Sequence, residues 1–119
     1  MNPDSHRSRA LALAGLVFVA AACFGQQPQR VHVRAERFSF TPSQIKVKAG
    51  QPVELVLSSE DTQHGFLIRK LGVDQEIPAR GKGENRVALP PLERGDYVFE
   101  CSRACGAGHN MMRGVIKAR

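Results

Sequence analysis

The sequence predicts an all-β domain, a Greek-key sandwich of short strands, preceded by an N-terminal segment that lies outside it. From Val31 onward, apolar residues alternate with polar ones or form short runs, and turn residues interrupt them about every eight to twelve positions. No long amphipathic helical pattern is present. The 119 residues can build one compact core, and 42% apolar with 24% charged residues is the composition of a folded protein.

Residues 1–25 have the features of an export or anchoring segment. Arg7 and Arg9 give it a positive head, and residues 10–25 follow without a charge, which is typical of a secretory signal peptide. Two alternatives stay open. The apolar stretch approaches the length of a membrane anchor, and Cys23 after three alanines resembles a lipoprotein signal. All three interpretations predict that residues 26–119 form the domain, in a periplasmic or other extracytoplasmic location. The anchor and the lipoprotein signal would also attach it to the membrane.

Short runs rich in Val, Ile, Leu and Phe follow, as expected for strands. The expected strands are residues 31–35, 45–47, 53–58, 66–68, 85–89, 97–101 and 114–117. Pro or Gly marks the breaks that we expect at residues 41–43, 49–52, 81–83, 89–91 and 94–96. Seven short strands with this punctuation favour an antiparallel or Greek-key sandwich.

The chemistry is concentrated in residues 101–112, which read C-S-R-A-C-G-A-G-H-N-M-M. Cys101, Cys105, His109 and Met112 offer thiolate, imidazole and thioether donors. This set favours copper, because calcium and magnesium prefer oxygen and a structural zinc site rarely uses Met. His64, at the start of an expected strand, is available as a further ligand from a second loop.

Neighbouring residues are expected to have other roles. Gly106 and Gly108 allow tight backbone conformations between the ligands. Met111 is out of register with the ligand spacing, and Glu100 alternates to the opposite strand face, so neither is expected to bind the metal. His32 is expected to be solvated.

A disulfide between Cys101 and Cys105 is the simplest alternative, because extracytoplasmic thiols are normally oxidised or held by a metal. A crosslink that closes so short a loop gains little stability. It also explains neither His109 nor Met112.

His64 followed by C-x-x-x-C-G-x-G-H-x-x-M resembles the CuA motif of the copper domain in subunit II of haem-copper cytochrome c oxidases, shared with nitrous-oxide reductase. The resemblance covers roughly residues 34–119 and is closest to the small subunit II of ba3-type oxidases. It implies a cupredoxin-like fold with a binuclear centre of two copper ions. The implied metal ligands are Cys101 and Cys105 as bridges, His64 and His109 as terminal ligands, and Met112 and the backbone carbonyl of Arg103 as weak ligands.

The resemblance implies a carrier that accepts single electrons from a cytochrome c-like donor and passes them to an oxidase acceptor, either as the redox subunit of a cytochrome c oxidase or as a stand-alone relay. One alternative is copper delivery or sensing without sustained electron transfer. Another is a degenerate domain with a disulfide and a docking role. No Ser/His/Asp set or carboxylate pair accompanies the ligands, so the domain by itself is expected to be an electron carrier rather than an enzyme.

The net charge of +6 is scattered along the chain, without the basic runs or interleaved aromatic residues that bind nucleic acid, so no nucleic-acid partner is expected. In sequence, basic residues surround the ligand loop: Arg103, Arg113, Lys117 and Arg119. This pattern predicts an acidic redox partner.

Overall fold

The period-two pattern of the sequence becomes an inner and an outer face on most strands of the computed structural model, which describes Gly15 and residues 27–119. In β1 (Gln29–Glu36), Val33 and Ala35 are buried while His32 and Arg34 are exposed. His32 is therefore solvated, as expected, although it lies within the sandwich. Burial of one face per strand is what packs two sheets against each other.

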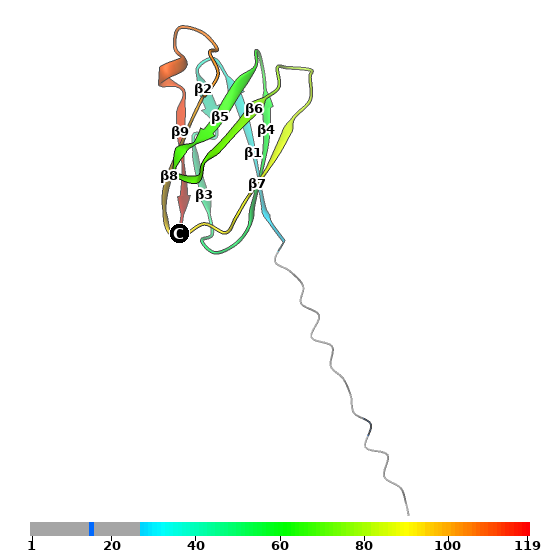
Figure 1. Ribbon diagram of the computed structural model, residues 1–119. Helices are drawn as coiled ribbons and strands as arrows, with labels where there is room; N and C mark the ends of the chain where they lie inside the picture. The colour runs from blue at the N-terminus through cyan, green and yellow to red at the C-terminus, as the bar shows by residue number, and fades with distance from the viewer. Residues whose placement is uncertain (1–14, 16–26) are drawn as a thin grey trace, which may run out of the picture.

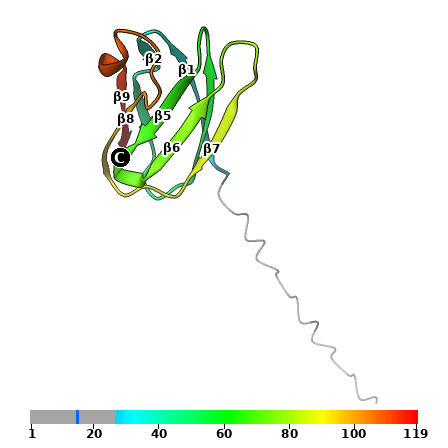
Figure 2. The ribbon, with the colours of Figure 1, turned by 45° about the horizontal axis from the view of Figure 1, so that its top comes forward.

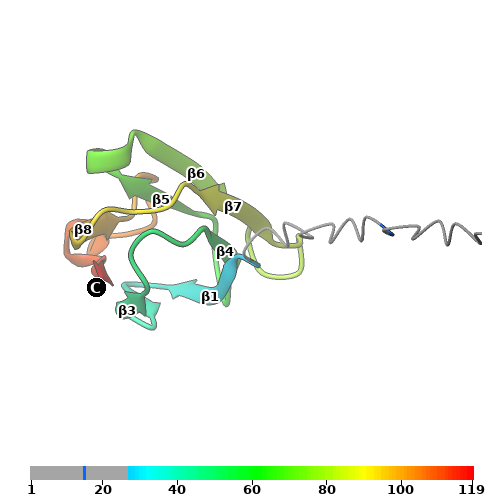
Figure 3. The same ribbon diagram turned by 90° about the horizontal axis from the view of Figure 1, so that it is seen from below.

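In residues 27–119, nine strands form two sheets (Figure 1). The first has the order β2-β1-β4-β7, with β2 (Ser39–Thr41), β4 (Val53–Ser59) and β7 (Asn85–Leu89). The second has the order β3-β9-β8-β5-β6, with β3 (Gln44–Val47), β9 (Arg113–Ala118), β8 (Gly95–Glu100), β5 (His64–Ile68) and β6 (Val73–Ile77). Figure 3 views the sandwich from below, with β5 and β6 on one side and β1 on the other.

Both sheets are mixed, so the expected sandwich is correct and its purely antiparallel variant is wrong. β1 runs parallel to β4, and β3 runs parallel to β9, whereas the other pairs are antiparallel. The chain crosses between the sheets after β2, β3, β4, β6 and β7, and such crossings allow parallel strands to lie side by side.

All seven expected strands are present, each within two residues of its expected ends. β2 and β6 were not expected. Two short 3-10 helices, η1 (Arg69–Leu71) and η2 (His109–Met111), complete the elements, and residues 27–119 contain no α-helix.

Three phenylalanines form the aromatic centre of the core beneath the ligand loop. Phe66 and Phe99 stack with ring centroids 4.8 Å apart, and Phe40 packs edge-on against both, at 5.9 and 5.1 Å. Aromatic pairs of this kind add stabilisation beyond the area that they bury. The three rings come from both sheets, so they fix the sheets relative to each other.

The expected signal peptide, lipoprotein signal or anchor of residues 1–25 lies outside the described residues, apart from Gly15. In residues 27–119, no helix has the length and hydrophobicity needed to cross a lipid bilayer.

Candidate metal centre

Three connections meet at the end of the sandwich opposite the C-terminus (Figure 1). They are the β1–β2 turn at residues 37–38, the β4–β5 connection at residues 60–63, and the β8–β9 loop at residues 101–112. Figure 2 brings this end forward and shows the β8–β9 loop beside β2. The paired strands beneath hold these loops in place, which suits a site that needs fixed ligands.

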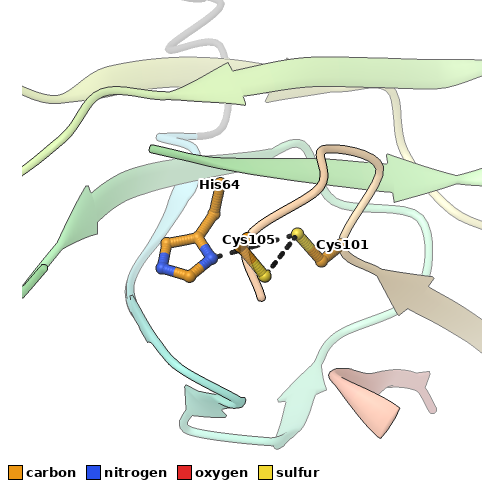
Figure 4. A group of neighbouring side chains, drawn as sticks. All are labelled: His64, Cys101 and Cys105. Carbon is orange, nitrogen blue, oxygen red and sulfur yellow. Dashed lines mark hydrogen bonds between the residues drawn. The ribbon is translucent and has the colours of Figure 1, made fainter. Parts of the chain in front are cut away.

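His64, Cys101 and Cys105 bring their donor atoms together within 4.8 Å of one another (Figure 4). The two sulfur atoms are 3.7 Å apart, and Nδ1 of His64 lies 3.9 Å from Sγ of Cys101. Both cysteines are free thiols, so the disulfide alternative does not describe this structure.

The remaining predicted ligands gather around the same two thiols. Nδ1 of His109 lies 3.6 Å and Sδ of Met112 lies 3.9 Å from Sγ of Cys105. The carbonyl oxygen of Arg103 is 3.1 Å from Sγ of Cys101. The six residues of the predicted ligand set therefore converge in space, and their donor atoms fit copper.

The donor side chains differ in how deeply they are buried. His64 and Met112 are fully buried, the two cysteines are nearly so, and His109 is only half-buried. A surface hollow lined by Cys101, His109, Asn110 and Arg113 reaches this part of the site. The neighbouring Met111 is 81% exposed.

Asp61 orients the ring of His64. Its Oδ1 lies 2.7 Å from Nε2 of His64, so a proton on Nε2 is favoured and Nδ1 keeps its lone pair for a metal. Burial alone would raise the pKa of Asp61, but hydrogen bonds from the Arg37 amide and from His64 lower that pKa to about 2. Asp61 is thus a carboxylate at any physiological pH.

The thiol of Cys105 is protonated at neutral pH in the metal-free protein. Burial, followed by the neighbouring Cys101 thiol, raises the pKa of Cys105 to about 11. A metal binds the thiolate, so loading must displace this proton.

Two glycines permit close approaches that a side chain would block. A Cβ on Gly65 would collide with the Ser102 hydroxyl and lie 2.9 Å from the backbone nitrogens of Ser102 and Arg103. A Cβ on Gly108 would overlap the ring of Phe38. The expectation of an unusual backbone holds for Gly106, at φ +139°, but Gly108 has φ −91° and is required for its contact with Phe38.

Glu100 has the structural role that its strand position predicted. Its carboxylate accepts hydrogen bonds from Arg69 at 2.6 Å and Arg113 at 3.2 Å. Hydrogen bonds from the two arginines outweigh the effect of burial and lower the pKa of Glu100.

The expected basic surround is partly wrong. β9 runs away from the site, so Lys117 and Arg119 lie near the start of β8, where Arg119 pairs with Asp96 at 2.8 Å. Arg103 and Arg113 do flank the ligands, but Arg103 contacts Asp74 at 3.5 Å and Arg113 pairs with Glu100. The sequence pattern therefore predicted more positive charge at the ligand end of the sandwich than the structure has.

A β-sandwich with Cys, His and Met donors gathered at one end defines a small copper-binding domain. The chain belongs to the cupredoxin-like domain family, whose family model matches residues 9–117. The family resemblance seen in the sequence is confirmed by similarity to subunit 2 of cytochrome c oxidase from Thermus thermophilus. That protein is 30% identical over 93 residues, which are 77% of this chain and 67% of the relative.

Two solved structures share the fold. One is a heme-copper terminal oxidase dimer, with a TM-score of 0.68, 23% identity, and coverage of 76% of this chain and 65% of the other. The second is the periplasmic domain of subunit II of cytochrome oxidase from Bradyrhizobium japonicum, with a TM-score of 0.70, 13% identity, and coverage of 81% and 88%.

The chain spans between about half and two thirds of the length of its Thermus relatives, since a second such subunit is covered over 54%. The family relationship and the His64, Cys101 and Cys105 cluster together support copper binding and electron transfer.

Proposed function

We propose that this domain holds two copper ions in a CuA centre and carries single electrons, as the redox domain of a subunit II-like protein. The observation that carries the proposal is the approach of two free thiols to 3.7 Å with one imidazole beside each of them. A blue-copper site needs one thiolate and would leave the second unexplained.

Each donor would have a distinct part. Cys101 and Cys105 would bridge the metals, and His64 and His109 would each complete one end. Met112 and the Arg103 carbonyl, at 3.9 and 3.1 Å from the thiols, would be weak ligands. Two metals that share both thiolates spread one electron over the pair, so bond lengths change little on reduction. Ligands fixed from two loops of a stiff sandwich keep that change small.

Electron paramagnetic resonance of the copper-loaded domain tests the proposal. We expect hyperfine structure from one unpaired electron shared equally by two copper nuclei, with two copper ions per chain by metal analysis. A spectrum from a single copper nucleus, or loss of copper on dialysis, would contradict a CuA centre and favour copper delivery by the same donors.

Met112→Leu should keep both copper ions but raise the reduction potential. Met112 is fully buried and Leu has a similar volume, so the fold should tolerate the change. The lost thioether donates weakly to the oxidised centre, and its loss disfavours that state. Met111→Leu is the matched control, since Met111 is exposed beside it. Voltammetry should separate the two variants; loss of copper from Met112→Leu would show that Met112 is a primary ligand.

We further propose an extracytoplasmic location, with attachment to the membrane through residues 1–25, and a cytochrome c-like donor or an oxidase acceptor as partner. Half-buried His109 supports an electron route through its ring, because it is the donor nearest the surface among the five side chains of the site. The similarity to oxidase subunits supports the location and the class of partner.

The partner's charge should have only a modest effect on the rate. Arg69, Arg103 and Arg113 lie near the site, but Glu100 and Asp74 pair with them, so an acidic donor should react less than about tenfold faster than a basic donor at low salt. Stopped-flow kinetics over a range of ionic strength measure this preference. Arg103→Glu should reverse it, and rates indifferent to salt and to that substitution would leave the arginines without a docking role.

A further inference from the structure

The β1–β2 turn touches both ligand-bearing loops through one residue, Arg37. Its backbone amide donates to Oδ2 of Asp61 at 2.8 Å, and its guanidinium Nε donates to the carbonyl oxygen of Cys105 at 2.8 Å. Asp61 in turn holds His64. Contacts therefore run from the Cys105 loop through Arg37 and Asp61 to His64, and Arg37 is not itself a predicted metal ligand.

We propose that Arg37 is a positioning residue that fixes the Cys105 half of the ligand loop, residues 104–111, relative to His64. Its consequence for copper rests on the proposed function, whereas its effect on the loop is a property of the metal-free protein. Arg37 is 24 residues from Asp61 and 68 residues from Cys105, so only the folded sandwich brings the three together.

The two halves of the ligand loop are held differently. The Cys101 half is tied to β5 and β6, because the Gly65 amide donates to Sγ of Cys101 and the Ser102 hydroxyl donates to Asp74. The Cys105 half makes most of its hydrogen bonds within itself, such as those from the amides of His109 and Met111 to Gly106 and Gly108. Residues 104–111 receive one hydrogen bond from another element of the described chain, apart from contacts to sulfur. That bond comes from Arg37.

Packing on the same turn supports this role. The ring of Phe38 lies directly against the backbone at Gly106 and Gly108, where a Cβ on either glycine would meet it. Phe38 thus limits how closely the loop can approach the β1–β2 turn, while the Arg37 guanidinium limits how far the loop can move away from it. Arginine suits this role because its planar fork is pre-organised, so it loses less rotamer freedom for each hydrogen bond than lysine.

The guanidinium also brings a positive charge to the Cys105 residue, since its Nε lies 2.8 Å from the carbonyl oxygen of Cys105. A positive charge beside a metal–thiolate centre favours its reduced state. Position and charge can be separated, because Arg37→Lys keeps the charge and loses the fork, whereas Arg37→Gln loses both.

The test compares Arg37→Gln and Arg37→Lys with Arg86→Gln, in which an exposed arginine loses its pairs with Glu54 and Glu84 far from the site in the fold. In the metal-free proteins, amide hydrogen exchange at residues 104–111 should become roughly three- to tenfold faster in both Arg37 variants, the range expected for one lost hydrogen bond. Exchange in the core strands and in Arg86→Gln should stay at the wild-type rate. Affinity for one equivalent of copper(I), measured by competition with a chromogenic chelator, should fall by a similar factor in both Arg37 variants.

In the copper-loaded proteins, the reduction potential should fall in Arg37→Gln and stay closer to wild type in Arg37→Lys. Asp61→Asn should weaken copper(I) binding as well, and its effect combined with Arg37→Gln should be less than additive, because Arg37→Gln breaks the Cys105 end and Asp61→Asn the His64 end of one chain of contacts. The inference is overturned if loop exchange and copper(I) affinity in both Arg37 variants match those of Arg86→Gln. A wild-type protein that binds only one copper would defeat the CuA proposal while leaving the exchange result valid.

Discussion

Cys101→Ser and Cys105→Ser should each abolish the shared two-copper spectrum completely. Each sulfur lies close to the other sulfur and to an imidazole, so each is needed by both metal positions of the proposed centre. A serine hydroxyl stays protonated near neutral pH and does not replace a thiolate as a bridge. Any copper that remains should give the spectrum of a single nucleus, by electron paramagnetic resonance, with at most one ion per chain.

Ala104→Ser is the matched control for this pair. It places the same side chain between the two cysteines at an exposed position and removes no donor, so it should load two copper ions as the wild type does. Thermal unfolding of the metal-free variants should remain close to wild type, because Ser and Cys differ little in volume. A shared spectrum that survived in either Cys variant would remove that cysteine from the bridging role.

The main part of the fold could be predicted because seven strands carry their own pattern of apolar residues. β2 and β6 could not. β2 is three residues long, and β6, V-D-Q-E-I, is rich in residues that strands disfavour and pairs only with β5 at the edge of its sheet. Their strand conformation comes from the neighbouring strand rather than from their own sequence.

The metal-binding side chains could be predicted because four of them lie within one loop and their spacing is visible. Arg37 could not, since its contacts use a backbone amide and a carbonyl oxygen at separations of 24 and 68 residues. Asp61 leaves a weak signal, as a carboxylate three residues before His64. The errors at Lys117 and Arg119 have the same origin, because neighbours in sequence separate along a strand.

Oxidation of the metal-free domain should block copper loading entirely. The two sulfur atoms are 3.7 Å apart, and a disulfide needs about 2.05 Å, so a small movement of the loop would join them. With oxidised glutathione as the oxidant, the two thiols would lose two protons and two electrons, and the reagent would be reduced to two glutathione molecules. The resulting disulfide has no thiolate to offer a metal.

Oxidation that begins at Cys105 should be slow at neutral pH and faster in alkali. Burial first, and then the Cys101 thiol, raise the pKa of Cys105 to about 11, so only roughly one Cys105 side chain in ten thousand is a thiolate at pH 7. A thiol reacts as its thiolate, so the rate through Cys105 should rise about tenfold for each pH unit between 7 and 10. An ordinary thiol would level off near its lower pKa, which makes the continued rise above pH 9 the distinguishing result.

Thiol counting in denaturant follows the reaction, and copper analysis after each time point follows its consequence. We expect copper uptake to fall in proportion to the thiols lost and to return in full after treatment with a reductant. Cys105→Ser, incubated in the same way, cannot form the internal bond and should lose thiol only to mixed disulfides with glutathione. Two thiols that persisted at pH 10, or full copper uptake by the oxidised protein, would show that the pair of cysteines is held apart or that it does not bind the metal.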